Sequence, residues 1–208
     1  ERQETEVVTQ ALRIGDIAIA TTPNETYAIT GLKIKGSSPL EKTMVIELAN
    51  GGDGYIPPPE QHLFGGYNTW AARSAGLEVS AEPRIAESCT LLLEQVTGVP
   101  RRHPRQSRGP AASAIAQLQP AAWYRLDEFA GPRALDSSPH RHDAIYESHV
   151  TYYLEGPRSA LFCGPGQTNR AAMFAGGRLR TRPPGLADQW SLSLWFWNGM
   201  PSDARKVS

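Results

Sequence analysis

The stretch Met44-Val-Ile-Glu-Leu-Ala-Asn-Gly-Gly-Asp-Gly-Tyr-Ile-Pro-Pro-Pro-Glu-Gln-His-Leu-Phe-Gly-Gly-Tyr67 is the most informative part of this chain. In it an apolar strand runs directly into a glycine-rich polar loop, which is where α/β enzymes keep their chemistry. Upstream, a second apolar strand from Ile14 to Thr22 leads into the polar turn Pro23-Asn-Glu25, and the segment between the two strands has helical character. Strand, helix and strand in this order predict a crossover unit with parallel strands.

The crossover also predicts where two polar residues lie. The loops that follow its two strands leave the sheet at the same edge, so we expect Glu25 and Tyr55 to approach each other. A carboxylate and a phenol would then meet in one cleft, where they could hold a cation or an oxyanion. Two alternatives stay open. Glu25 is also explained as an acid in the first turn of a helix capped by Thr22 or Asn24, and Tyr55 as a tyrosine that covers a loop.

Length and charge favour two modules. A chain of 208 residues holds one large domain or two small ones. Residues 1–97 carry 7 Lys and Arg against 13 Asp and Glu, whereas residues 98–208 carry 14 against 8, so the net charge changes from −6 to +6. Surfaces of opposite charge indicate different modules. There is no run of about 18 apolar residues, so the sequence predicts no transmembrane segment.

The cysteines match no metal-binding spacing, and one group of histidines has an alternative explanation. Cys89 and Cys163 lie one in each half, and we expect both to be free thiols. His140 and His142, with His149 nearby, could share one face of a strand and bind a metal. The adjacent Asp136-Ser-Ser-Pro predicts a turn, so a solvated loop is favoured.

A helix and a linker are expected to separate the two modules. Residues 83–96 form the clearest predicted helix, because apolar side chains recur there at helical spacing and a glycine follows: Ile85, Cys89, Leu92 and Val96, then Gly98. This helix ends the first module, residues 1–97. Residues 98–119 contain four arginines, no acid, and prolines that argue against a helix, so we interpret them as a basic linker. Because no aromatic residues are interleaved, a solvated tether is favoured over contact with nucleic acid or anionic lipid.

Residues 120–208 have a β-like texture. Short apolar pieces are separated by Gly, Pro, Asp and Ser, at 123–126, 144–146, 152–154, 171–174 and 191–197. Frequent turns without a long helix predict an antiparallel sandwich. The 89 residues from Pro120 fall short of the roughly 100 that a small sandwich uses, so we expect an incomplete module. The alternating aromatic strand from Ser191 to Trp197 would need further strands beside it.

The first module resembles the closing part of the catalytic domain of neutral/alkaline ceramidases, over roughly residues 10–97. The residues that carry this resemblance are Gly15 to Glu25, Ala49-Asn50 with Gly54-Tyr-Ile-Pro57, Glu60, and Gly65-Gly-Tyr67. That family shows a Pro-Gly-Glu turn, a later Asn and Gly-Tyr loop, and a Tyr-Glu pair before the final helix. Order and spacing agree as well as residue types.

The resemblance implies a zinc-dependent hydrolase of N-acyl amides. Family members hold zinc with two histidines, a glutamate and a tyrosine, and the matching metal positions here are Glu25 and Tyr55, with Tyr55 also the catalytic residue that steadies the oxyanion. Tyr67 competes for the tyrosine's role. The chain departs from the family at Asn24, where glycine is usual, and at Asn68, where an acid often follows the tyrosine.

The histidine pair of the family has no counterpart in this chain. All five histidines come after Glu25, so the matching pair would lie upstream of Glu1. A zinc hydrolase typically needs three protein ligands and an open position for water. With two ligands at most, we expect this chain alone to bind zinc weakly and to have no amidase activity.

The second module resembles the first half of a laminin G-like domain, of the concanavalin A-like lectin/glucanase jelly-roll group. Five ordered blocks carry the resemblance: residues 123–128 with Gly131, 134–138, 142–144, 169–174 with Gly176, and 190–195. It implies a two-sheet jelly roll, a carbohydrate-binding or adhesion module of exported proteins, sometimes with calcium. Asp127 and Glu128 match a conformational block of that family, so we interpret both as structural.

The predicted fold is therefore an α/β fragment with parallel strands followed by an all-β two-sheet jelly-roll sandwich, in part. The predicted function is that of a fragment of an exported multidomain protein, located outside the cell, in the periplasm or on the cell surface by resemblance. Its partners would be a lipid amide or other N-acyl substrate and a glycan or surface protein, and no nucleic acid. The rival is a non-catalytic cell-surface binding protein with a degenerate hydrolase scaffold. Two histidines upstream of Glu1, at the ends of earlier strands, would favour the enzyme.

Overall fold

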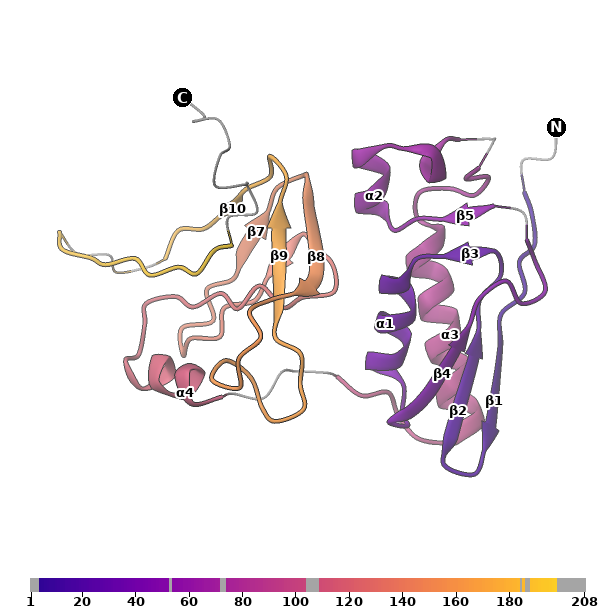
Figure 1. Ribbon diagram of the computed structural model, residues 1–208, viewed down its shortest axis with the longest axis horizontal. Coiled ribbons are helices and arrows are strands. Elements are labelled where there is room, and N and C mark those ends of the chain that lie inside the picture. Colours follow the sequence, from indigo (N-terminus) through magenta and orange to yellow (C-terminus); the bar gives the residue numbers. More distant parts are fainter. Residues whose placement is uncertain are drawn as a thin grey trace.

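The computed structural model describes residues 4–52, 54–71, 74–103, 109–183, 185 and 188–197 (Figure 1). Over these residues the chain mixes helices with strands that form several small sheets, none of them closed. No helix in the described ranges is long and apolar enough to cross a membrane.

The first sheet contains the predicted crossover. Its strands are β1 (Gln10–Ile14), β2 (Ile17–Thr21) and β4 (Lys42–Ile46), in the order β1-β2-β4. β2 and β4 are parallel and are connected through α1 (Ala28–Ser37), which confirms the predicted strand, helix and parallel strand. The strand expected from Ile14 to Thr22 is interrupted by a hairpin turn, because Gly15 takes the left-handed backbone (φ 62°) that a tight turn needs.

The loops that follow β2 and β4 continue the pairing beyond the sheet. Ala49 N–H donates to the Thr22 carbonyl at 3.1 Å, and Leu48 N–H donates to the Asn24 carbonyl at 3.0 Å. The pairing ends in a short parallel ladder between β3 (Glu25–Thr26) and β5 (Tyr55–Ile56). Backbone bonds therefore fix these loops against each other.

Two helices cover one face of the first sheet. α3 (Ala81–Thr97) packs against β1, β2 and α1 (Figure 1), and small strand residues lie beneath the helices: Ala11, Ala18 and Ala20. The predicted helix 83–96 is thus confirmed. Its buried side includes Leu93 and Thr97 rather than Leu92 and Val96, because the helix turns the 85–89–93 line toward the sheet.

Two short helical elements lie between β5 and α3. α2 (Pro59–Phe64) begins at a proline, which needs no N–H in the first helical turn. The 3₁₀ turn η1 (Tyr67–Thr69) follows the glycine pair, whose positive φ values of 72° and 103° turn the chain sharply.

We call the described residues up to Thr97 the first unit and those from Pro110 onward the second unit. The residues that directly follow α3 form hydrogen bonds and ion pairs with the first unit. The Arg101 guanidinium bridges Glu87 and Glu94, at 2.8 Å in each case. The Arg102 guanidinium donates to the carbonyls at the end of α1 and beyond it: Lys35 at 3.0 Å, Ser38 at 2.6 Å and Leu40 at 3.3 Å. The expectation of a free tether is therefore wrong at these two arginines.

The prediction that prolines keep residues 98–119 from forming a helix is also wrong. α4 (Pro110–Gln117) lies in this segment. Its proline occupies the first helical turn, where a missing N–H costs nothing, and an alanine-rich run follows. The proline was expected to prevent a helix, but Pro110 begins one.

The second unit consists of two small antiparallel sheets. One has the order β10-β7-β6, with β6 (Arg133–Ala134), β7 (Ala144–Tyr146) and β10 (Leu179–Arg180), and the other pairs β8 (Val150–Glu155) with β9 (Arg170–Phe174). The buried residues between them are Ala134, Ala144, Tyr146, Val150 and Tyr152. Three of the predicted strands, at 144–146, 152–154 and 171–174, are confirmed.

The two other predicted strands of this unit are wrong. Residues 123–126 contribute a single bridge, between Tyr124 and Asp136. Residues 191–197 form no strand in the structure, although their polar and apolar side chains alternate. No described strand pairs with them, and a strand without a hydrogen-bonded neighbour leaves its N–H and C=O groups to water. Their large side chains stay exposed, with Trp197 at 88%.

Candidate functional site

Glu25 and Tyr55 are direct register partners in the parallel β3–β5 ladder. They follow β2 and β4 respectively, beyond the carboxyl ends of these two parallel strands. The Tyr55 hydroxyl donates a hydrogen bond to the Glu25 carboxylate. The prediction that the crossover brings these two side chains within reach of each other is confirmed.

Glu25 is not the first-turn acid that the sequence suggested. It lies in β3, half-buried, and α1 begins only at Ala28 with Tyr27 as its N-cap residue. No acid occupies the first turn of α1. The interpretation of Thr22 or Asn24 as the helix cap is therefore wrong, because pairing with the Tyr55 loop holds residues 25–26 extended.

Tight backbone packing positions Tyr55. Gly54 has a φ of 116°, and a Cβ atom at this residue would lie 2.5 Å from the Ser74 carbonyl oxygen, so only glycine fits here. The Gly54 carbonyl accepts from Glu25 N–H at 3.0 Å, and the next N–H, that of Tyr55, donates to the Ser74 carbonyl at 2.6 Å. Tyr55 is thus fixed from both sides.

Asn24 occupies a position with a special backbone conformation. Its φ is 54°, in the left-handed region, and the residue is buried. Glycine takes this conformation freely, and asparagine is among the few other residues that tolerate it. The asparagine therefore keeps the turn that a glycine at this position would make.

The electrostatics of the pair keep the phenol protonated. The hydrogen bond to Glu25 raises the pKa of Tyr55 above its usual value, and the negative charge of Glu25 adds to the effect. The phenol therefore stays protonated beside the carboxylate. A cation that bound both oxygens would replace this proton, since metal ligands of this kind bind in the deprotonated form.

An aromatic row extends from this pair. The Tyr55 and Tyr67 rings meet edge to face with centroids 5.8 Å apart, and Tyr67 meets Trp70 in the same way at 5.7 Å. Tyr67 is 63% exposed and Trp70 52%. Tyr67 was the alternative to Tyr55 as the metal-binding tyrosine. In the structure its ring contacts Tyr55, and it is Tyr55 that is paired with Glu25.

Sequence reasoning missed Tyr27 and Trp70. Tyr27 forms a hydrogen bond with Asn68, and its burial raises its pKa. It follows Glu25 by two residues in an extended segment, so the alternation of a strand was the signal that could have placed it near Glu25. Trp70 had no such signal, because its position depends on the turn made by Gly65 and Gly66.

A buried acid lies between the helices of the first unit. The Glu82 side chain is fully buried and accepts from the Thr30 hydroxyl at 2.8 Å and from the Lys33 ammonium at 2.9 Å. Glu60, which the resemblance includes, lies within electrostatic reach of both Glu82 and Lys33, and its burial raises its pKa. The contacts of Glu82 tie α1 to α3.

The other residues weighed as ligands do not gather in one place. Among the described residues no group of three or more His, Cys, Asp or Glu side chains could hold a metal ion. The backbone N–H groups of His140 and His142 donate to the side chains of Ser138 and Asp136, as expected for the predicted turn. Asn50, one of the residues that carry the resemblance, has a φ of 64°, a conformation typical of turns.

The two cysteines are free, as expected, and the acids Asp127 and Glu128 contact neighbouring protein groups. Cys89 and Cys163 are free thiols, and burial raises the pKa of Cys89 to about 11. Glu128 accepts from the Leu135 N–H and the Tyr146 hydroxyl, and Asp127 lies 3.7 Å from the Arg125 guanidinium.

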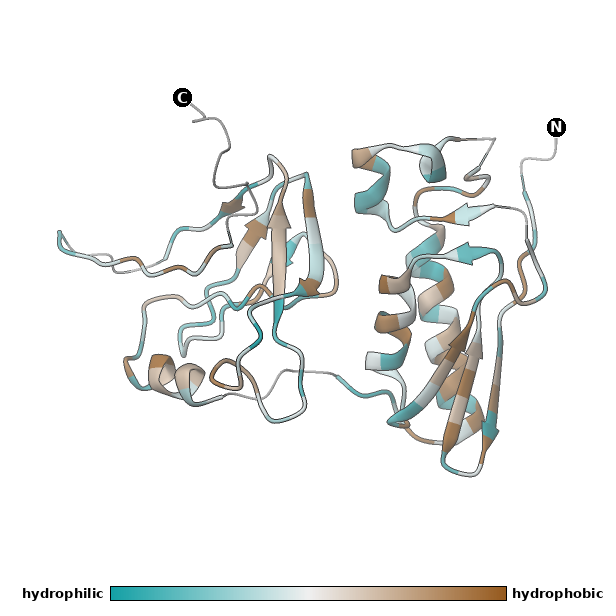
Figure 2. Ribbon diagram, in the orientation of Figure 1, coloured by the Kyte–Doolittle hydropathy of each residue, from teal (hydrophilic) through white to brown (hydrophobic). Residues whose placement is uncertain are grey.

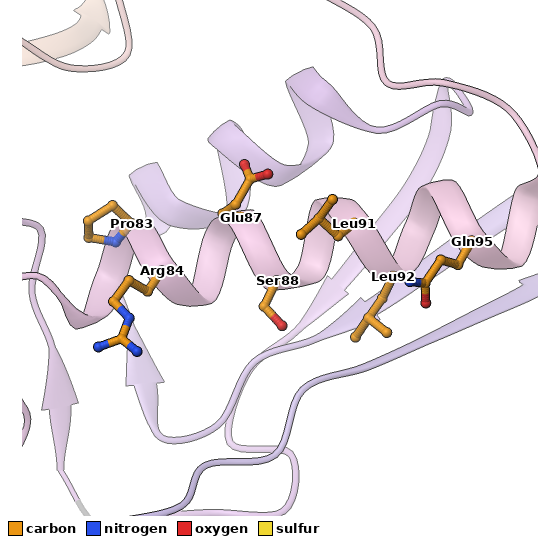
Figure 3. A pocket seen from close by; sticks show the side chains of 7 residues that line it. All are labelled: Pro83, Arg84, Glu87, Ser88, Leu91, Leu92 and Gln95. Atoms are coloured by element: carbon orange, nitrogen blue, oxygen red, sulfur yellow. The ribbon is translucent and has the colours of Figure 1, made fainter.

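An open hollow of about 560 Å³ lies away from the Glu25–Tyr55 pair, on the outer surface of α3 (Figure 3). It is lined by Pro83, Arg84, Glu87, Ser88, Leu91, Leu92 and Gln95, all from that one helix. None of the candidate site residues lines it.

No family model, no curated protein and no solved structure matches this chain.

Proposed function

We propose that residues 1–97 are the C-terminal part of a ceramidase-like zinc amidase module and that the residues from 120 onward begin a laminin G-like jelly-roll sandwich. Residues 98–119 would connect the two modules. The parent would be an exported multidomain hydrolase of N-acyl amides, found outside the cell, in the periplasm or on the cell surface. This proposal rests on the resemblance of each module to a known family, together with the geometry of the first unit.

The observation that carries the proposal is the parallel register of Glu25 with Tyr55. The pair lies beyond the carboxyl ends of β2 and β4, where open α/β sheets bind their ligands. A glycine that no other residue could replace fixes the loop before Tyr55. Functional side chains that are held by a rigid backbone are typical of binding and catalytic sites.

The donor set fits half of a zinc site. Glu25 would supply a carboxylate, which is a common zinc ligand, and Tyr55 the phenol that the resembling family uses. Imidazoles from outside this chain would have to supply the remainder. When bound, zinc would polarise an amide carbonyl and activate water. On this chain, Tyr55 would hold the oxyanion side of the site, and its parallel register with Glu25 would keep the two side chains beside each other.

For the second unit we extend the proposal to a binding role. Its two small antiparallel sheets share an apolar core, which would fit part of a sandwich. Its ligand would be a glycan or a surface protein, with calcium as an additional ligand in some members of the resembling group. Neither sheet presents a pair of acids spaced as in a glucanase motif.

Zinc titration tests the metal proposal directly. Zinc in large excess should convert Tyr55 to the bound phenolate, which is read by tyrosinate absorbance, whereas Tyr55→Phe and Glu25→Gln should abolish the change. The Tyr67→Phe variant is the matched control, because its ring lies beside Tyr55 without bonding to Glu25. We expect weak binding and no hydrolysis of an N-acyl amide by the chain alone.

Two results would overturn this reading. Tight one-to-one zinc binding that Glu25→Ala abolishes would show that the missing ligands have been misplaced. An unchanged tyrosinate signal at saturating zinc would remove the metal site and favour the rival function, a non-catalytic cell-surface binding protein.

A further inference from the structure

The carboxylate of Glu25 has aromatic neighbours and no basic one within the described ranges. Glu25 is half-buried in β3, and its register partner is Tyr55. None of the ion pairs between described residues involves Glu25. Figure 2 shows that the chain becomes hydrophilic here, since β3 is teal whereas β2 and β4 are largely brown. A negative charge therefore lies at the end of two apolar strands without a cation from the described part of the chain.

The aromatic row leads outward from this carboxylate. Its rings, those of Tyr55, Tyr67 and Trp70, contact one another edge to face, with interplanar angles of 76° and 70°. Two rings at nearly a right angle form a corner with two ring walls, and the face of an aromatic ring carries partial negative charge. Because the side chains of Tyr67 and Trp70 are both more than half exposed, this corner is open to a ligand from solution.

Hydrogen bonds fix the backbone that carries the row. The Ser74 hydroxyl donates to the Tyr67 carbonyl, and the N–H groups of Ser74 and Ala75 donate to the Trp70 carbonyl at 3.1 and 3.0 Å. The Ser74 carbonyl in turn accepts from the Tyr55 N–H at 2.6 Å, which joins the row to β5. On the side of the row these bonds use main-chain atoms only, so they do not depend on the rings. A site held in this way loses little conformational entropy when it binds a ligand.

The second unit shows how rings of this chain are used when a cation is already at hand. The Arg125 guanidinium lies 5.8 Å from the centroid of the Trp123 ring, and the Arg170 guanidinium lies 4.2 Å from that of Tyr153. None of the cation–ring contacts between described residues involves the aromatic row. A cation from solution would therefore meet no competing side chain of the described part at these rings.

We propose that Glu25 and the aromatic row bind an organic ammonium ion of the methylated or quaternary type. Such a cation is attracted to the faces of aromatic rings, and proteins recognise it with several rings at once. The carboxylate beside Tyr55 adds a full negative charge to this attraction. The net charge of −6 on residues 1–97 favours the approach of a cation as well. This inference does not depend on zinc or on the proposed hydrolase.

The chemistry of these side chains favours an organic cation over other ligands. An anion would be repelled by the charge of Glu25, and a neutral ligand would gain nothing from it. A metal ion needs several directed ligands, and the described residues contain no group of three or more His, Cys, Asp or Glu side chains that could hold one. A methylated ammonium needs no directed ligands, because its charge is spread over methyl groups that pack against ring faces.

Titration of the whole chain with choline, in the presence of a metal chelator, tests the proposal by NMR of labelled aromatic rings. The signals of Tyr67 and Trp70 should shift with a Kd in the millimolar range. Trp70→Leu and Glu25→Gln should each raise this Kd about threefold to tenfold, because each removes one attractive group. Tyr67→Phe keeps the ring and should leave the Kd within about twofold of the original. Because no zinc is present, the result is separate from that of the zinc titration.

Two controls separate charge from apolar contact and this site from other exposed rings. The alcohol in which a tert-butyl group replaces the trimethylammonium group of choline has the same shape without the charge, and it should bind at least tenfold more weakly. Trp195→Leu removes an exposed ring of the second unit and should leave the Kd for choline unchanged. Circular dichroism of Trp70→Leu and Glu25→Gln should show native secondary structure, since neither side chain belongs to the buried core. Equal binding of choline and its neutral analogue would overturn the proposal. So would ring signals that do not shift, or a Kd that stays unchanged in Trp70→Leu or in Glu25→Gln.

Discussion

The hydroxyl of Tyr55 donates a hydrogen bond to the carboxylate of Glu25, its register partner across two parallel strands that are only two residues long. The two residues are 30 positions apart in the chain, and the intervening helix α1 returns the chain to the same edge of the sheet. A carboxylate beside a phenol disfavours the phenolate, so the Tyr55 phenol keeps its proton unless a cation binds beside it.

The first prediction concerns the pKa of Tyr55. Glu25→Gln removes the negative charge that disfavours the phenolate, so the pKa of Tyr55 should fall toward its usual value of 10.0. Titration of carbon-labelled tyrosine by NMR, with Tyr55 assigned through Tyr55→Phe, would measure this change. Glu41→Gln, at an exposed residue before β4, should leave the pKa of Tyr55 where it is.

The second prediction concerns the turn at Asn24. Asn24→Val places a β-branched residue in the left-handed region, which should lower the free energy of unfolding by about 1–2 kcal/mol. Asn24→Gly suits the same backbone and should stay closer to the original chain. Urea unfolding of the two variants decides the question, and equal losses in both would show that the backbone conformation of this residue is not what matters.

The third prediction concerns the buried ion pair between α1 and α3. Lys33→Met removes the cation that faces the fully buried Glu82, so the free energy of unfolding should fall by about 3–5 kcal/mol. The double variant Lys33→Met with Glu82→Gln leaves no buried charge and should recover part of the loss. Chemical denaturation of the single and double variants measures both effects. A double variant no more stable than the single one would contradict this account.

The fourth prediction concerns acid stability. Hydrogen bonds from Arg101 lower the pKa of Glu87 and of Glu94 below the usual 4.5. Their contribution to stability is therefore complete above pH 4.5 and is lost as the pH falls through the lowered pKa values. Arg101→Met removes this contribution, so the difference in stability between the original chain and this variant should shrink as the pH falls below 4.5.

A neighbouring arginine provides the control for the acid experiment. Arg102 donates to backbone carbonyls, which do not titrate, so Arg102→Met should lower stability by the same amount at every pH. Glu60 responds in the opposite direction, because burial raises its pKa and its protonation favours the folded state at low pH. Since Glu60 is present in every variant, its effect cancels in the differences.

Local pattern was sufficient for the elements in which neighbouring residues decide the structure. The helix α3 was readable from its apolar spacing and from Gly98, whose left-handed backbone ends it. The crossover from β2 through α1 to β4 was readable from the order of apolar runs, and the handedness of such connections then placed Glu25 near Tyr55. For this helix and this crossover, the apolar pattern and the rules of sheet topology allow few other structures.

The parallel crossover and the approach of Glu25 to Tyr55 could be read from the sequence, because both follow from periodicity and from the geometry of a crossover. The tertiary structure was needed to show that Glu25 is extended rather than helical, since long-range pairing with the Tyr55 loop outweighs a local preference for a helix start. It also decided that residues 191–197 are not a strand, because alternation creates a strand only where another backbone is present to accept its hydrogen bonds.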